Sequence, residues 1–365
     1  DDAYRALIER GGRNQSILVS GESGAGKTET VKIVLNYLSY VSSFGRKLGK
    51  VYAADRVLRA NPVLESFGNA KTLRNDNSSR FGKFIQVQFD ENKGDLKGAY
   101  IETYLLEKAR VVHQAKGERN YHIFYELAAG ASSEQRRRWN FPKSLKSCRY
   151  TCQSGTMKRS DIDDLAQFQT TVGAMEVLNF SPSDVERIFR CVVAVLHLGN
   201  IDFDETINKE GLSAAFVVNP EESTELASEL LGIDAGHLEE VLTTRIINIS
   251  GSESMVKPMS MIEAEDARDA LAMNLYERVF GWVVWRTNLS IGMDDKQYEA
   301  MLARQEQQRQ YLERARRRGE EEDLEELAAA GPVPAEITSV GASLSMNPFR
   351  ISINKAFAHA LRVSG

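Results

Sequence analysis

The chain has 365 residues and a formal net charge of −5, with 42% hydrophobic and 27% charged residues. A chain of this length can bury a large core, which excludes the small folds that depend on disulfides or metals. The 46 basic residues are balanced by 51 acidic ones, which argues against nucleic acid as a partner. Only three cysteines occur, Cys148, Cys152 and Cys191, which fits a reducing compartment, and we expect a cytoplasmic protein.

The first part of the chain predicts alternating helices and strands. Ser16–Ser20 is a short apolar run typical of a buried strand, and a glycine-rich turn follows it. Further along, two runs with alternating or strand-like apolar residues indicate a hairpin. The expected elements in this part are a helix over Ala3–Arg10, the strand Ser16–Ser20, a helix over Lys27–Tyr40, an exposed loop over Ser42–Lys50, a helix over Asp55–Phe67, and a hairpin of Lys83–Asp90 with Tyr100–Leu106.

The middle of the chain is mainly helical in its periodicity. Ser181 followed by Pro182 is a natural helix cap and first-turn pair. The predicted helices are His122–Ala129, Asp161–Leu178, Pro182–Leu198, Ser223–Gly232, His237–Thr243 and Ile262–Asn288, followed by a charge-dense helical segment over Asp294–Ala330. We therefore expect an α/β core over residues 1–110 that contains the glycine-rich turn, a mainly helical unit over 111–290, and a divergent charged tail over 291–365.

No membrane span or targeting segment is expected. The longest apolar stretches, near Cys191–Leu198 and Val279–Trp285, are far shorter than the roughly 20 residues of a membrane-spanning helix. The N-terminus begins with two aspartates and has no basic region followed by an apolar one, so we expect no signal peptide. We expect the chain to begin inside a longer protein.

A phosphate-binding loop is the clearest chemical signal. The run Gly21-Glu22-Ser23-Gly24-Ala25-Gly26-Lys27-Thr28 matches G-x-x-x-x-G-K-[ST] and lies between a predicted strand and a predicted helix. The glycines let backbone N–H groups turn toward phosphates, and Lys27 can reach the β- and γ-phosphate oxygens. Thr28 is the expected Mg²⁺ ligand. The alternative is a glycine-rich turn with a chance lysine, and we favour binding of a nucleoside triphosphate with Mg²⁺.

A cluster of polar residues lies between the predicted helix Asp55–Phe67 and the predicted hairpin that begins at Lys83. It reads Asn75-Asp-Asn-Ser-Ser-Arg80-Phe-Gly-Lys83, and taken alone it is typical of a hydrated loop. Downstream of a phosphate loop, a segment with serine hydroxyls can supply a second Mg²⁺ ligand and a γ-phosphate contact.

Six blocks in this order resemble the myosin motor head. They are GESGAGKTET, NPVLESFGNAKTLRNDNSSRFGKF, YLLEKARVV, ERNYHIFYEL, VLHLGNIDF and DARDALAMNLYERVFGWVVWRTN. The resemblance implies an α/β fold, a partial myosin motor with a P-loop NTPase core of mostly β-sheet flanked by helices and a large helical upper subdomain. It also implies an actin-activated ATPase associated with the cytoskeleton.

The resemblance assigns roles within the polar cluster, which it identifies as the first switch. Ser79 matches the Mg²⁺ ligand, Ser78 the contact to the γ-phosphate and attacking water, and Asn75 a phosphate contact. Arg80 matches the arginine that pairs with a glutamate of the second switch. With Lys27, Ser78 and Arg80 form the expected catalytic group. Thr243–Ser260 falls at an actin-facing loop, and Ser42–Lys50 at a variable loop that tunes nucleotide release.

The second switch that the family requires is not found in this sequence. The only D-x-x-G, Asp95-Leu-Lys-Gly98, lies in the predicted hairpin turn. Because closure around the γ-phosphate needs both switches, we expect weak binding of ATP with Mg²⁺ and no actin-activated turnover by this chain. Two alternatives remain: a non-catalytic motor relative that acts as a regulator or scaffold, and a small-molecule kinase that shares only the phosphate loop.

Other candidate residues favour structural roles. Cys148 and Cys152 have no histidine or second cysteine pair at ligand spacing, so we expect thiols rather than a metal site. His122 and His197 lie in apolar helical contexts and are expected to be packed core residues. The aromatic run Phe280–Trp285 is likewise expected in the core.

Overall fold

The structure is a computed structural model. It describes residues 1–9, 12–22, 24–43, 52–90, 93–160, 162–207, 211, 213–248 and 254–292. Residues 44–50 of the expected loop and residues 293–365 of the expected tail, with the charged segment Asp294–Ala330, lie outside these ranges. Among the described helices, none has the length and apolar character needed to cross a membrane.

The helices predicted within the described ranges are present to within a few residues at each end, and the short helices α4, α6 and α7 were not predicted. Ser181 is the cap of α9 and Pro182 its first residue, as the sequence predicted. Both α9 and α12 begin with complete capping boxes, the latter at Ser260. The helices are α1 Asp2–Ile8, α2 Lys27–Ser43, α3 Tyr52–Gly68, α4 Ala109–Val112, α5 His122–Gly130, α6 Ser133–Arg138, α7 Arg149–Cys152, α8 Asp164–Val177, α9 Pro182–Gly199, α10 Thr224–Leu231, α11 Ala235–Thr243 and α12 Met261–Ile291, with short 3₁₀ turns at Leu145–Ser147 and Pro220–Glu222.

The described strands form four separate antiparallel pairs. The predicted hairpin is confirmed as β3 with β4, in which Ile85 lies opposite Ile101. The strands are β1 Asn69–Ala70, β2 Ser78–Ser79, β3 Gly82–Phe89, β4 Leu96–Tyr104, β5 Asp202–Ile207, β6 Ser213–Val218, β7 Thr244–Asn248 and β8 Ser254–Pro258. The chain thus mixes helices and strands as expected, but in the described ranges each sheet has only two strands.

The predicted strand Ser16–Ser20 is wrong for this structure. Residues 12–20 have neither helical nor strand structure, and the side chains of Ile17 and Leu18 are 55% and 91% exposed. A buried strand requires hydrogen-bonded neighbours, and no described strand pairs with this segment. The apolar run alone therefore did not determine its structure.

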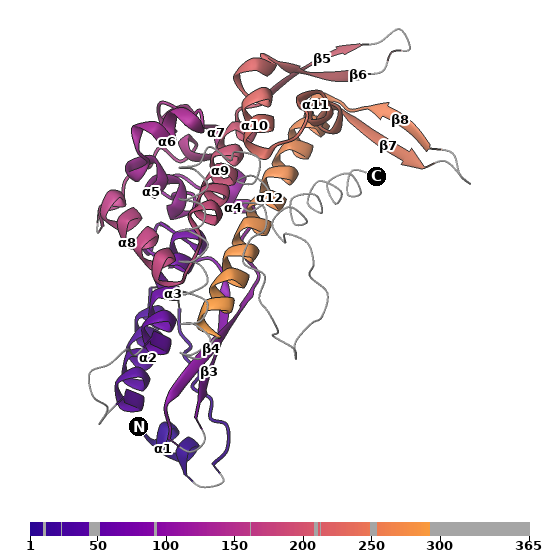
Figure 1. The fold of residues 1–365 in the computed structure, drawn as a ribbon. Helices are drawn as coiled ribbons and strands as arrows, with labels where there is room; N and C mark the ends of the chain where they lie inside the picture. The colour runs from indigo at the N-terminus through magenta and orange to yellow at the C-terminus, as the bar shows by residue number, and fades with distance from the viewer. Residues whose placement is uncertain are drawn as a thin grey trace, which may run out of the picture.

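The core is organised around α9 and α12. The long helix α12 runs diagonally through the molecule (Figure 1) and packs against α9, α3 and β4. Residues 191–199 of α9 are all buried, which explains why this stretch is apolar on every side. Tyr276 of α12 stacks on Tyr121 and donates a hydrogen bond to the Phe67 carbonyl at 2.8 Å. The aromatic run near Phe280 and both predicted histidines, His122 and His197, are buried as expected.

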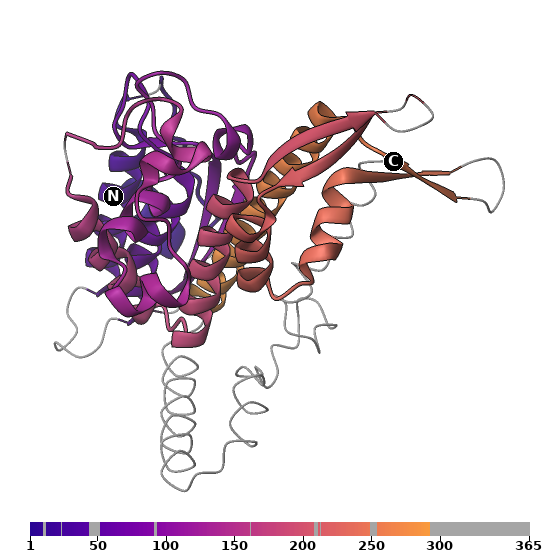
Figure 2. The same ribbon diagram turned by 90° about the horizontal axis from the view of Figure 1, so that it is seen from above.

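Two hairpins project from the helical part in the same direction, as both views show (Figures 1 and 2). The pair β5 and β6 was not predicted, because the sequence here was interpreted as mainly helical. The pair β7 and β8 occupies most of Thr243–Ser260, so the expected actin-facing loop is largely an antiparallel hairpin with Thr244 opposite Pro258. Residues 249–253 at its tip lie outside the described ranges.

Candidate nucleotide site

The predicted phosphate loop forms a tight turn directly before α2. Gly21, Gly24 and Gly26 have φ values of 152°, 85° and 82°, which residues with side chains rarely adopt. Apart from its two chain neighbours, no described residue has an atom within 4 Å of a Cβ built on Gly26, so the backbone conformation is what requires glycine there. Ser23 lies outside the described residues, and Glu22 and Ala25 are joined by a backbone hydrogen bond of 3.2 Å.

Lys27 and Thr28 are the first two residues of α2. Their N–H groups point ahead of the helix, where no intrahelical acceptor exists, and the helix dipole adds positive potential. The Lys27 ammonium donates to the carbonyls of Gly21 and Glu22 at 2.5 and 2.6 Å, so it folds over the loop. The sequence predicts that phosphates bind in this region, at the start of α2.

The predicted first switch is held by a turn and a short ladder. Thr72 and Asn75 close the turn, with the Thr72 N–H 2.8 Å from the Asn75 carbonyl. Ser78 and Ser79 form β2, which pairs with Asn69–Ala70 of β1. Ser78 is buried and Ser79 exposed. The Ser79 hydroxyl donates to the Phe81 carbonyl at 2.9 Å, which leaves its oxygen lone pairs available for a cation.

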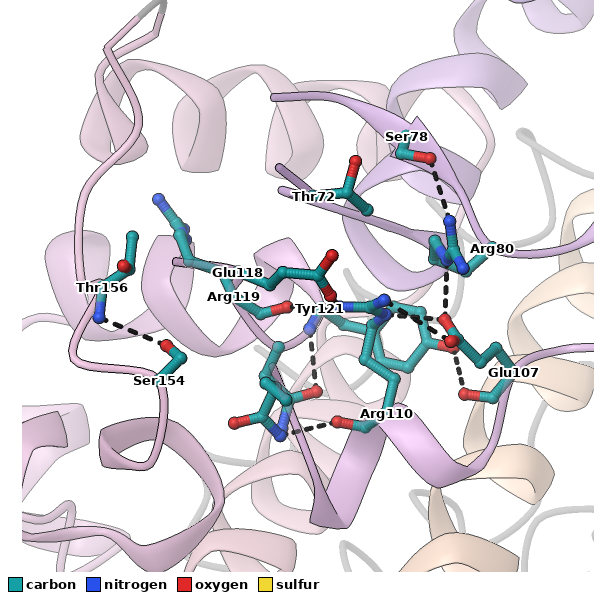
Figure 3. Close-up of polar contacts among 12 residues, drawn as sticks. Thr72, Ser78, Arg80, Glu107, Arg110, Glu118, Arg119, Tyr121, Ser154 and Thr156 are labelled. Atoms are coloured by element: carbon teal, nitrogen blue, oxygen red, sulfur yellow. Dashed lines mark hydrogen bonds and ion pairs between the residues drawn. The ribbon is translucent and has the colours of Figure 1, made fainter. Parts of the chain in front are cut away.

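Arg80 has a counter-ion that the sequence reasoning did not identify. Its Nε lies 2.6 Å from Glu107 Oε2, and its Nη1 donates to the Ser78 hydroxyl at 3.1 Å (Figure 3). Arg110 shares Glu107 at 2.6 Å and also binds Glu118 at 2.9 Å. Burial raises the pKa of Glu107, but the hydrogen bonds from the two arginines outweigh it and lower that pKa below its usual value.

Glu107 was missed because the resemblance assigned the partner of Arg80 to a second switch. The available signal was its place in the block YLLEKARVV, directly after β4. The Glu107 N–H also donates to the Arg80 carbonyl at 3.0 Å, so backbone and side chain hold the two residues together.

Two contacts bring the phosphate loop and the first switch together. A Cβ built on Gly24 would lie 3.7 Å from the carbonyl oxygen of Arg74, the residue before Asn75. Lys32 of α2 forms an ion pair with Glu65 at 2.9 Å, and Glu65 accepts a hydrogen bond from Asn77 at 3.1 Å. The two predicted halves of the site are therefore neighbours in the fold.

The donor set fits a magnesium nucleotide better than a protein-only metal centre. No group of three or more His, Cys, Asp or Glu side chains in the described part of the chain could hold a metal ion. Thr28 and Ser79 offer hydroxyl oxygens, and Mg²⁺ in phosphate sites takes few protein ligands besides phosphate oxygens and water. The described cysteines are free thiols: burial raises the pKa of Cys148 to about 11 and that of Cys191 to about 12.

The fold mixes helices with small sheets, and a glycine-rich turn directly before α2 lies beside the polar segment that begins at Asn75. Residues 1–303 match the family model of the myosin head (motor domain). The chain belongs to the myosin head family.

Several curated myosins are similar to the chain. It is 43% identical over 291 residues to unconventional myosin-Ia of Gallus gallus, covering 80% of this chain and 27% of that protein. It is 42% identical over 296 residues to unconventional myosin-Ib of Homo sapiens, covering 81% and 25%. Myosin-5 of Arabidopsis thaliana is 43% identical over 298 residues, covering 81% and 19%. The matched region thus spans about a quarter or less of each relative.

Proposed function

We propose that this chain is a myosin-type motor segment that binds ATP with Mg²⁺ at the phosphate loop. The observation that carries the proposal is the loop itself, with three glycines at positive φ, Lys27 at the start of α2, and the first switch beside Gly24. The bound nucleotide would supply the phosphate oxygens that complete the Mg²⁺ coordination.

The residues of the phosphate loop and the first switch would bind different parts of the nucleotide and its Mg²⁺. The backbone of residues 21–28 and the Lys27 ammonium would bind the phosphates, and the Thr28 and Ser79 hydroxyls would hold Mg²⁺. Asn75 would contact a phosphate, and Ser78 would contact the γ-phosphate and the attacking water; both lie on the segment that meets the loop at Arg74.

We further propose that hydrolysis by this chain is slow. Arg80 is engaged by Glu107 at 2.6 Å, so its guanidinium already has a carboxylate partner in this chain. Losing one preorganised hydrogen bond to the transition state costs about 3 kcal/mol, which corresponds to roughly a hundredfold in rate. The pairing of Arg80 with Glu107 also favours the second candidate function, a non-catalytic nucleotide-binding regulator or scaffold.

Actin filaments are the proposed partner, with weak affinity, and the proposed location is the cytoskeleton. The hairpin of β7 and β8 projects from the helical part, but it offers few charges for an encounter. Arg245 is already paired with Glu263 at 2.9 Å, which leaves Lys257 as the other basic residue of the described hairpin.

Titration with a fluorescent ATP analogue in the presence of Mg²⁺ tests the binding proposal. We expect Lys27→Ala to weaken binding about 10- to 100-fold, since it removes charge-assisted hydrogen bonds to phosphate. Lys146→Ala, an exposed lysine of the 3₁₀ turn Leu145–Ser147, is the matched control and should bind as the unmodified chain does. Equal affinity of both variants would refute the site.

Steady-state ATPase assays with and without filamentous actin test the proposals of slow hydrolysis and weak actin binding. We expect little turnover and no stimulation. A clear increase in rate on adding actin would refute slow hydrolysis, and tight ATP-sensitive cosedimentation would refute weak actin binding.

A further inference from the structure

Asn77 lies in the middle of the first switch and has more partners than any residue beside it. Its N–H donates to the Asn75 side chain at 2.9 Å, and its amide nitrogen donates to Glu65 at 3.1 Å. Its amide oxygen accepts from Asn69 at 2.9 Å. A donor to a carboxylate on one side and an acceptor from an amide on the other fix which way the Asn77 amide points.

A buried histidine, His122, also contacts the amide oxygen of Asn77. His122, the first residue of α5, is 1% exposed, and its Nε2 lies 3.1 Å from the amide oxygen of Asn77. The same Nε2 also lies 3.1 Å from Nη1 of Arg159. Burial, followed by the charges of Arg159 and Arg119, lowers the pKa of His122 well below its usual value, so the ring is neutral.

A neutral ring nitrogen cannot serve both neighbours. With a hydrogen, Nε2 donates to the Asn77 oxygen; without one, it accepts from Arg159. The Nδ1 atom is buried and has no hydrogen-bond partner among the described residues, so it does not select the tautomer. Two groups face Nε2: the Asn77 oxygen, which can only accept and whose direction is fixed by Asn69 and Glu65, and the Arg159 guanidinium, which can only donate. The hydrogen is assigned to Nε2, on the side of the fixed amide.

We propose that His122, as the Nε2–H tautomer, is a positioning residue that fixes the first switch through Asn77. The inference rests on the proposed nucleotide function, because the segment it positions carries Asn75 and Ser78. His122 itself touches no predicted phosphate ligand and acts through Asn77.

Asn77 also joins the first switch to α2, the helix that begins at the phosphate loop. Glu65 of α3 accepts from Asn77 and pairs with Lys32 of α2 at 2.9 Å. His122 therefore holds one end of a chain of polar contacts that runs from α5 through the switch to α2. A loss of the His122 bond releases Asn77 on the side away from α2.

Two substitutions of His122 separate positioning from general packing. In His122→Gln the amide nitrogen can reach the place of Nε2 and donate to Asn77, whereas the shorter side chain in His122→Asn cannot. His197→Asn is the matched control, because His197 is also buried and its Nε2 lies 2.9 Å from the Asn140 carbonyl, in contact with a different part of the fold.

Amide hydrogen exchange without nucleotide is the first measurement. We expect His122→Asn to speed exchange of residues 77–80 about three- to tenfold, the ratio for losing one ordinary hydrogen bond. His122→Gln should restore protection, and His197→Asn should leave this segment unchanged. Equal exchange in the Gln and Asn variants, or an equal increase in the His197 control, would overturn the proposal.

The tautomer can be read in the unmodified protein from the imidazole ¹⁵N shifts, which keeps the test valid if His122→Asn does not fold. An Nε2–H signal for His122 is expected, and an Nδ1–H signal would overturn the proposal. The rate at which a fluorescent ATP analogue is released should then change about tenfold in His122→Asn and stay unchanged in His122→Gln. If the unmodified chain binds no nucleotide, the proposed function fails, and exchange and tautomer still decide the role of His122.

Discussion

Glu126 makes the stability of this fold depend on pH. Its side chain on α5 is fully buried, and Oε2 accepts hydrogen bonds from Ser66 of α3 at 2.7 Å and from Thr171 of α8 at 3.0 Å. Its Oε1 has no hydrogen-bond partner in the described structure. Burial raises the pKa of Glu126 to about 7, although the two hydroxyls partly oppose this.

The sign of the effect follows from linkage. The ordinary pKa is 4.5, and the pKa in the folded state is about 7, so folding favours the protonated carboxyl. The resulting stabilisation is complete below the unfolded-state pKa and is lost as pH rises through the folded-state pKa. At about 1.36 kcal/mol per pKa unit, roughly 2.5 kcal/mol of stability disappears between pH 5 and pH 8.

Glu126→Gln removes this ionisation without changing the size of the side chain. We expect the unmodified chain to lose about 2.5 kcal/mol relative to the variant between pH 5 and pH 8, measured by urea unfolding at several pH values. Glu176→Gln, at an exposed position of α8, the helix that carries Thr171, is the control and should follow the unmodified chain. A difference between the unmodified chain and Glu126→Gln that stays constant across this pH range would refute the reasoning.

Two further substitutions test the loop and the docking of α12. Gly26→Ala forces a side chain onto φ 82°, at a cost of roughly 1–2 kcal/mol, so binding of a fluorescent ATP analogue should weaken about tenfold. Gly173→Ala, in a helix with open space around it, should not weaken binding. Asn288→Leu breaks the bonds from its side chain to the Ile101 N–H and carbonyl at 2.8 and 2.7 Å, and urea unfolding should show a loss of about 3 kcal/mol. Asn274→Ala, whose amide bonds only its own helix at Ala270, should cost less than about 1 kcal/mol.

The sequence predicted those elements whose structure depends on local signals. The helix α9 has its cap at Ser181, its first-turn proline and a buried stretch in consecutive positions, so its start was predictable to the residue. The hairpin of β3 and β4 was predictable from the alternation in Lys83–Asp90, because one face of an antiparallel pair packs inward.

Features that depend on distant partners were not predictable. The pair β5 and β6 has short strands, and Ala215 is held by a hydrogen bond to the Met259 carbonyl, far along the chain. The ion pair of Arg80 with Glu107 depends on the end of β4 returning beside β2. Single-chain periodicity contains no information about which acid reaches a given arginine.

Leu18 offers a direct test between the sequence pattern and the structure. As part of a buried strand, as the apolar run predicts, Leu18→Ser would remove a packed side chain and cost about 3 kcal/mol or more. In the structure Leu18 is 91% exposed, so we expect a change within about 0.5 kcal/mol by urea unfolding. Leu198→Ser, at a fully buried position of α9, is the positive control and should cost at least about 3 kcal/mol. A loss for Leu18→Ser that approaches that of Leu198→Ser would show that Ser16–Ser20 is buried, and the exposed arrangement beside the phosphate loop would then be wrong.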